Sequence, residues 1–129
     1  MMIEVTFDGK KKINANFRGF VVKTDQDTQA GGDNSAPSPF ELFLASIATC
    51  SGIYVKSFCD IRNLPTHNIR IVQEIEYDES KKLVKDIFIH ISLPPDFPEK
   101  YREPLFTVVN MCKVKQHLTN PPKINILME

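Results

Sequence analysis

The chain has three cysteines, and two of them lie where a thiol could react. Cys50 lies in the long apolar segment 38–52, SPFELFLASIATCSG, and Cys112 lies in a similar setting within segment 108–115, VVNMCKVK. Two thiols on two predicted helices suggest redox chemistry, because one sulfur can attack an oxidant and the other can then close a disulfide. The alternative is that both thiols are packing residues, since free Cys is among the most buried residue types.

The spacing of the cysteines limits which of them can pair. Cys59 comes nine residues after Cys50, so at about 100° per residue it faces the opposite side of the same helix. Cys112 comes 62 positions after Cys50 (112 minus 50). Those two can form a disulfide only if the fold packs their helices together, with Cα atoms within about 4.4–6.8 Å. The sequence leaves that question open.

Other kinds of site have little support in the sequence. His67, His90 and His117 are scattered over a predicted loop, strand and helix, and there is no C-x-x-C motif, so we expect no zinc site. Cysteine acyl transfer needs a positioned base, and none of the three histidines has a favourable context for it. Gly31 and Gly32 lack the spacing of a phosphate-binding loop, so we expect no nucleotide or other cofactor.

Composition and charge narrow the class of protein. Sixteen Lys and Arg balance sixteen Asp and Glu, so no net field favours a nucleic acid or an anionic membrane as partner. The N-terminal segment reads as a strand and not as a signal peptide, and no run of 18 uncharged apolar residues occurs. An odd number of widely spaced cysteines fits a reducing compartment. We therefore expect a cytoplasmic protein with one domain over residues 1–129 and no membrane partner.

The helix that carries Cys50 has a well-marked start. Ser38 fits the N-cap, Pro39 fits the first helical position, and Glu41 completes a capping box three residues after Ser38. The segment 40–48 is apolar almost all round, which is typical of a helix buried on several sides. The sequence Asn-Leu-Pro at 63–65 predicts the end of this helix.

The remaining pattern predicts an α+β fold. Alternating apolar residues predict three strands at 3–7, 13–17 and 19–23, then a loop at 24–37 and, after the helix, a second hairpin at 69–77 and 87–93. Residues 99–120 are helical in pattern, with a start or a kink at Pro104. Residues 123–128 read as a last strand. The predicted order is βββ-α-ββ-α-β.

Two segments resemble those of a known family. Residues 37–52, PSPFELFLASIATCSG, resemble the P-x-E-L-x-L segment and following Cys of the OsmC and organic hydroperoxide resistance proteins. Residues 112–118, CKVKQHL, are similar to the Cys-Pro-Val signature of the same family. The chain length and the order of elements match the family over essentially the whole sequence. The resemblance implies two main helices packed on antiparallel sheets and an intertwined homodimer.

The resemblance also implies an activity. It implies a thiol peroxidase in which Cys50 attacks an organic hydroperoxide, Cys112 resolves the oxidised thiol as a disulfide, and an external dithiol resets the pair. The other interpretation is a non-catalytic small-molecule-binding or interaction domain on the same scaffold, with structural cysteines.

The chain departs from the family pattern at two positions. In the hydroperoxide-resistance branch a Glu ten residues before the reactive Cys holds an active-site Arg, whereas here that position is Phe40 and the carboxylate is at Glu41. Lys113 replaces the Pro of Cys-Pro-Val. Glu41 is nevertheless our candidate for the active-site carboxylate.

A reactive thiolate at Cys50 needs a nearby cation. Cys50 lies twelve residues after Ser38, too far along the helix for the N-terminal dipole, which fades within about one turn. Arg18 is our candidate, because it lies at a strand boundary just before the Asp- and Gly-rich loop. It would stabilise both the thiolate and the charge that develops on the leaving oxygen.

Overall fold

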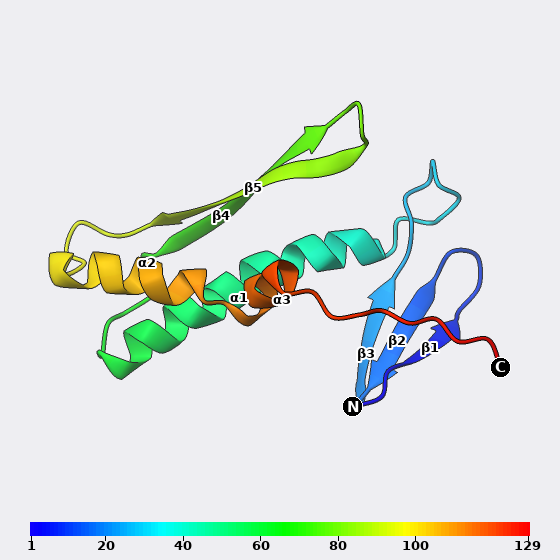
Figure 1. Cartoon of the computed structure of the whole chain (residues 1–129), viewed down its shortest axis with the longest axis horizontal. Coiled ribbons are helices and arrows are strands. Elements are labelled where there is room, and N and C mark those ends of the chain that lie inside the picture. The colour runs from blue at the N-terminus through cyan, green and yellow to red at the C-terminus, as the bar shows by residue number, and fades with distance from the viewer. The chain divides into compact units, whose positions relative to one another are not determined.

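The computed structural model describes residues 1–129 as two compact units, Met1–Ala45 and Ser46–Glu129. The longest helix, α1 (Pro39–Ile61), contributes its first residues to one unit and the remainder to the other (Figure 1). Strands and helices are both present and largely separate along the chain, so the predicted α+β class is confirmed.

The first unit contains a three-stranded antiparallel sheet. Its strands β1 (Glu4–Phe7), β2 (Ile13–Phe17) and β3 (Phe20–Thr24) pair in sequence order, as the alternating pattern predicts. The turn between β2 and β3 consists of Arg18 and Gly19, whose φ values are 49° and 83°. Two successive residues with positive φ are typical of a tight hairpin turn whose twist matches that of its strands.

The loop after β3 is organised by Asp25, whose side chain is fully buried. Its carboxylate accepts hydrogen bonds from the Ser35 hydroxyl (2.6 Å) and from the backbone N–H groups of Ser35 (3.0 Å), Asp33 (3.2 Å) and Gln26 (2.8 Å). The bonds from Ser35 do most to hold the pKa of this carboxyl far below its ordinary value, because they favour the charged form. Gly32 lies so close that an added Cβ would come within 2.0 Å of the Gln26 carbonyl oxygen. The loop therefore has one well-defined shape up to the start of α1.

Helix α1 begins and ends as the sequence predicts. The Glu41 N–H donates to the Ser38 hydroxyl (3.2 Å), and the Ser38 N–H donates to the Glu41 carboxylate (2.9 Å), which is a complete capping box. At the other end Asn63 adopts φ 54°, and the Leu64 N–H donates to the Cys59 carbonyl (2.9 Å). This left-handed residue with its long return bond is a common way to terminate a helix.

By length and hydropathy α1 could cross a membrane, which is weak evidence because core helices of soluble proteins have the same properties. Its uncharged stretch lies between Glu41 and Lys56 and contains only residues 42–55, fewer than the roughly 20 residues that span a bilayer.

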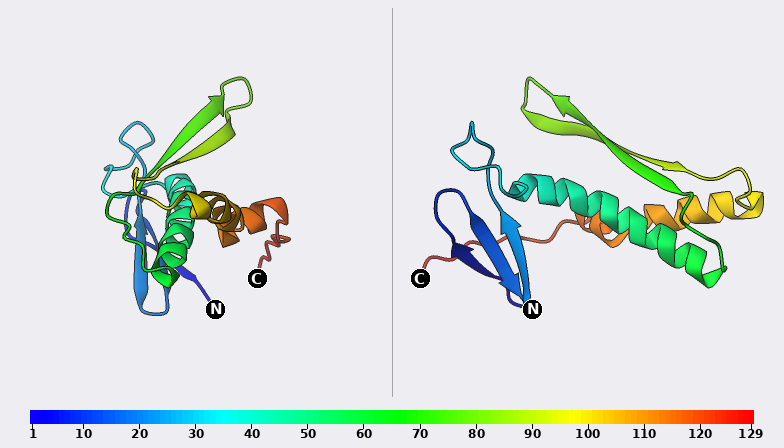
Figure 2. Two further views of the ribbon diagram at one scale, coloured as in Figure 1. Left: turned by 90° about the vertical axis from the view of Figure 1, so that its left-hand side faces the viewer. Right: turned by 180° about the vertical axis from the view of Figure 1, so that it is seen from behind.

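The second unit packs a long hairpin against helices. Strands β4 (Arg70–Asp78) and β5 (Leu83–Ser92) pair antiparallel, with Ile71 opposite Ile91 and Ile75 opposite Ile87. A 3-10 turn, η1 (Glu99–Tyr101), and two helices follow, α2 (Arg102–Asn110) and α3 (Lys113–Thr119). In Figure 2 the hairpin is a long two-stranded ribbon, and the loops at its open end lead to the helices. The buried core of the unit comprises Val55, Phe58, Cys59, Phe97 and Leu105.

Two predicted elements differ in the structure. The helical segment 99–120 is divided, and the break falls at Met111 and Cys112, not at Pro104. Pro104 is the third residue of α2, in the first turn, where an N–H has no partner within the helix and its loss costs little. The predicted strand at 123–128 was wrong, because these residues form no strand in this chain. Their apolar side chains, Ile124 and Ile126 among them, are almost fully exposed.

Candidate functional site

The structure brings two of the three thiols together. Cys50 lies mid-way along α1 and is partly exposed, whereas Cys112 lies between α2 and α3 and is buried. The Cys50 side chain is close enough to Cys112 to act on it through a hydrogen bond and through charge. Both are free thiols. The two side chains therefore lie close together within the second unit, although they are 62 positions apart in the sequence (112 minus 50).

Cys112 has a structural role as well as a chemical one. It is the N-cap of α3, with φ −57° and ψ 140°, and its sulfur accepts a hydrogen bond from the Lys115 N–H at 3.3 Å. Burial raises the pKa of the Cys112 thiol most, and the hydrogen bond and charge of Cys50 raise it further, although the Lys115 N–H lowers it. Cys112 therefore remains a protonated thiol at neutral pH and can donate a hydrogen bond toward Cys50.

Cys59 lies apart from this pair, as the helical phase predicts. It is fully buried in the core cluster of the second unit, beside Phe58 and Val55. Burial, and then the charge of Asp60, raise the pKa of the Cys59 thiol. Cys59 therefore serves as a packing residue.

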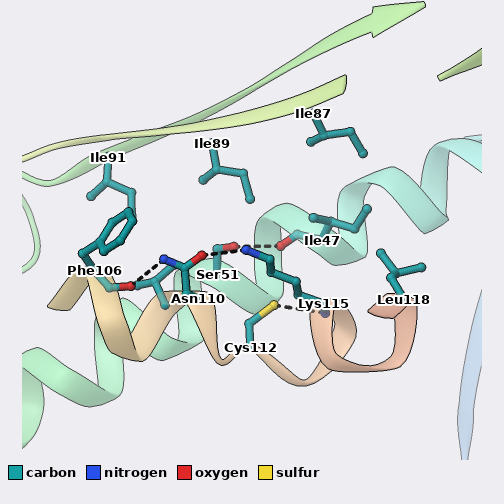
Figure 3. A pocket seen from close by; sticks show the side chains of 11 residues that line it. Ile47, Ser51, Ile87, Ile89, Ile91, Phe106, Asn110, Cys112, Lys115 and Leu118 are labelled. Carbon is teal, nitrogen blue, oxygen red and sulfur yellow. Dashed lines mark hydrogen bonds between the residues drawn. The ribbon is translucent and has the colours of Figure 1, made fainter. Parts of the chain in front are cut away.

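A largely apolar pocket opens beside Cys112 (Figure 3). Its volume is about 320 Å³, which is within the range of small-molecule sites. All of its lining residues belong to the second unit: they are Ile47 and Ser51 of α1, Ile87, Ile89 and Ile91 of β5, Phe106, Val109 and Asn110 of α2, Cys112, and Lys115 and Leu118 of α3. Cys112 lines the pocket and Cys50 does not, but Cys50 lies beside Cys112.

The polar edge of this pocket was not foreseen from the sequence. The Lys115 ammonium donates to the Asn110 side-chain oxygen (2.6 Å), and the Asn110 amide donates to the Phe106 carbonyl (3.1 Å). The available signal was that Lys115 lies three residues after Cys112, so that both face the same side of a helical turn. The break before α3, which the sequence did not reveal, decides that geometry.

The other two predicted site residues lie in the first unit. The Arg18 guanidinium lies 5.6 Å from the centroid of the Phe20 ring, in the turn between β2 and β3. Glu41 is exposed at the start of α1 and is bonded to Ser38 in the capping box. Cys50 and Cys112 belong to the second unit, so the roles of Arg18 and Glu41 beside the thiols stay predictions.

The histidines do not form part of the pocket. His90 lies 3.3 Å from the Glu74 carboxylate on the hairpin, and His117 contacts the Lys113 carbonyl at 2.7 Å on α3. No group of three His, Cys, Asp or Glu side chains in the chain could hold a metal ion. The ionisable side chains that line the pocket are those of Cys112 and Lys115.

A profile of the OsmC-like proteins matches residues 32–127, about three quarters of the chain and both cysteines of the pair. This chain belongs to the OsmC family. The family resemblance inferred from the segments around Cys50 and Cys112 is thus confirmed. No curated protein sequence matches this member of the family.

Solved structures share the fold of this OsmC-family chain over nearly its whole length. A protein from Psychrobacter arcticus 273-4 is 17% identical, with a TM-score of 0.74, and the match covers 90% of this chain and 86% of that one. An OsmC-like protein from Mycoplasma pneumoniae is 12% identical, with a TM-score of 0.70 and coverage of 93% and 87%. An organic hydroperoxide resistance protein OsmC from Legionella pneumophila, described as a predicted redox protein, is 15% identical, with a TM-score of 0.57 and coverage of 91% and 87%. At these identities the likeness establishes the OsmC fold alone.

Proposed function

We propose that this OsmC-family protein is a thiol-dependent peroxidase that reduces organic hydroperoxides with Cys50 and Cys112. The observation that carries the proposal is the contact between a partly exposed thiol, Cys50, and a buried thiol, Cys112, beside an apolar pocket. A two-cysteine peroxidase needs that asymmetry, because the first thiol must meet the oxidant and the second must be shielded until the first has reacted.

The first step is oxidation of Cys50. Its thiolate attacks the terminal oxygen of the hydroperoxide ROOH, the O–O bond breaks, and Cys50 becomes a sulfenic acid while RO⁻ takes up a proton and leaves as the alcohol ROH. In this step the Cys112 thiol lies beside the Cys50 sulfur, ready for the second step.

The second step closes a disulfide. The Cys112 sulfur attacks the sulfenic sulfur of Cys50, an S–S bond forms, and the hydroxyl group leaves as water together with the Cys112 proton. An external dithiol then reduces the Cys50–Cys112 disulfide to two thiols and is itself oxidised to a disulfide. The cycle thus uses one dithiol for each hydroperoxide.

In this proposal Arg18 supplies the cation that stabilises the thiolate and the leaving oxygen, and Glu41 holds Arg18. The protein acts in the cytoplasm as an intertwined homodimer. On α1 the apolar side chains of Phe40, Phe43 and Ile53 are exposed. Exposed apolar surface of this kind supports the proposal that a second subunit covers the helix.

The proposal is tested by the dithiol-dependent consumption of cumene hydroperoxide. The wild-type protein is expected to turn over many times, and Cys50→Ser is expected to abolish turnover. Cys59→Ala is the matched control, because it removes the cysteine that lies in the core and is expected to keep the activity. An inert Cys50 under excess cumene hydroperoxide contradicts the proposal.

A second candidate function is a small-molecule-binding or interaction domain with structural cysteines. The burial of Cys112 and its bond to the Lys115 N–H favour this alternative, since they give that thiol a purely structural use. The rate of alkylation distinguishes the two: a peroxidatic Cys50 reacts with iodoacetamide in the folded protein, whereas a packing thiol resists it.

A further inference from the structure

Helix α3 is short and has little support from the core. It has seven residues, and none of them is buried. Isolated helices shorter than about 12–15 residues are marginal in water, so a helix of this length depends on the contacts at its ends. The first turn of α3 has no acidic residue and carries Lys113 and Lys115, whose charges oppose the positive end of the helix dipole. The stability of α3 therefore depends strongly on its N-cap.

That N-cap is the sulfur of Cys112, which accepts a hydrogen bond from the Lys115 N–H at 3.3 Å. Two further bonds connect α3 to the end of α2. The Lys115 ammonium donates to the Asn110 side-chain oxygen (2.6 Å), and the Gln116 amide donates to the Met111 carbonyl (2.8 Å). Both of these bonds are exposed, where water competes for the same groups. One sulfur atom thus holds the start of α3 and also belongs to the thiol pair.

Closure of a Cys50–Cys112 disulfide changes the position of that sulfur. An S–S bond of about 2.0 Å is much shorter than a hydrogen-bond contact between two thiols, and its dihedral angle is restricted. Cys50 lies mid-way along the 23-residue α1, where the helix continues on both sides of it. Cys112 lies in the joint between α2 and α3 and has a non-helical ψ of 140°. We therefore expect Cys112 to make most of the movement.

Helix α3 also forms one wall of the pocket beside Cys112. Its residues Lys115 and Leu118 line the cavity (Figure 3). Cys112 lines the same cavity and is itself buried. A displacement of α3 therefore opens the pocket on the side of this buried sulfur.

We propose that α3 is a redox-controlled gate. When both thiols are reduced, the Cys112 sulfur caps α3 and the wall of the pocket is closed. When the disulfide forms, the sulfur leaves the Lys115 N–H and α3 loosens. The external dithiol then reaches the disulfide, supplies two electrons and two protons, and restores both thiols and the cap. The gate rests on the proposed function for its place in the peroxidase cycle, but the coupling between the disulfide and α3 does not.

The coupling is tested by amide hydrogen exchange of the full chain, followed by NMR. Diamide oxidises the two thiols to a disulfide and is itself reduced to a hydrazine, so no peroxide is needed. We expect the amides of α3, and that of Lys115 above all, to exchange about fivefold faster in the disulfide form, which is the factor that corresponds to the loss of one N-cap. The exchange of α1 and β5 is expected to stay the same. Dithiothreitol is expected to restore slow exchange in α3.

Two variants serve as matched controls. Cys112→Ser keeps an acceptor for the Lys115 N–H but cannot form the disulfide, so diamide is expected to leave its α3 exchange unchanged. Cys59→Ala keeps the thiol pair and is expected to show the same change as the wild type. Unchanged α3 exchange in the wild-type disulfide, or an equal change in Cys112→Ser, overturns the gate.

A second measurement tests access to the disulfide. Lys113→Glu places a carboxylate at the first residue of α3, where it stabilises the helix through the dipole. Small thiols are therefore expected to reduce the disulfide of this variant about two- to fivefold more slowly than that of the wild type. Cysteamine and 3-mercaptopropionate carry opposite charges, so slower reduction by both thiols cannot come from attraction or repulsion of the reagent. Any other pattern overturns the role of α3 in access.

The outcomes also separate the gate from the proposed function. If diamide forms the disulfide without loosening α3, the gate fails while the peroxidase proposal stands. If cumene hydroperoxide leaves Cys50 unmodified but the diamide-formed disulfide loosens α3, the peroxidase proposal fails and the coupling stands. If diamide forms no disulfide between Cys50 and Cys112, both fail.

Discussion

Replacing Cys112 by Ser or by Ala separates its structural role from its chemical role. Ser keeps an acceptor for the Lys115 N–H at the start of α3, whereas Ala keeps none. Both variants lack the thiol that closes the disulfide. The two substitutions therefore have the same effect on chemistry and different effects on stability.

The expected magnitudes follow from the contacts of Cys112. Loss of an N-cap acceptor costs about 1 kcal/mol, and loss of the buried sulfur from this 2% exposed side chain adds roughly another 1 kcal/mol. Ser recovers the first contribution but not the second. Cys112→Ala is therefore expected to be about 1 kcal/mol less stable than Cys112→Ser, or roughly 3–5 °C lower in Tm for a chain of this length.

The assay combines thermal unfolding in reducing buffer with peroxide consumption by the same samples. Both variants are expected to complete one slow cycle on Cys50 and then to inactivate, because no second thiol protects the sulfenic acid. Equal Tm values for the two variants would refute the role of Cys112 as a cap. Sustained wild-type turnover by either variant would refute its role as the resolving thiol.

Three further predictions concern other parts of the chain. The pKa of Asp25 is lower in the folded chain than in the unfolded chain, where it is about 3.9. Its contribution to stability is therefore full above that value and is lost as pH falls below it. Urea unfolding from pH 6 to pH 3 should show a steeper loss of unfolding free energy in the wild type than in Asp25→Asn. Gly32→Ala should destabilise the chain by about 1–3 kcal/mol, because the added Cβ would overlap neighbouring backbone. Gly52→Ala in α1 has open space around it and should be neutral or stabilising by up to about 1 kcal/mol. The denaturant midpoints of the two variants test this, and equal midpoints would contradict the overlap at Gly32. Iodoacetamide should label Cys50 well before Cys59 in the native state, because Cys50 is partly exposed and Cys59 is buried. Peptide mass mapping at timed intervals measures the two rates, and equal rates would contradict the burial of Cys59.

The sequence predicted those features that local chemistry decides. The capping box of Ser38 and Glu41 fixed the start of α1, and the alternation of Ile87, Ile89 and Ile91 predicted one buried face of a strand. The family resemblance rested on such local segments and is confirmed by the profile match.

The features that were missed depend on contacts distant in sequence or on an unusual residue. Nothing in a spacing of 62 positions shows that Cys50 and Cys112 meet, since only the packing of α1 against the chain after α2 decides it. The break at Cys112 was missed because Ser, Thr, Asp and Asn are the usual N-caps and Cys is not among them. The strand predicted at 123–128 was wrong because an alternating pattern forms a strand only where another strand offers its edge. The roles of Arg18 and Glu41 stay predictions.

The central claim is that Cys50 and Cys112 form one redox pair, and peptide mass mapping tests it most directly. The reduced protein is treated with one equivalent of cumene hydroperoxide, quenched and digested without reductant. The account predicts a Cys50–Cys112 disulfide peptide and an unmodified Cys59. An unmodified Cys50, or a Cys50 sulfinic acid beside a free Cys112 thiol, would contradict it.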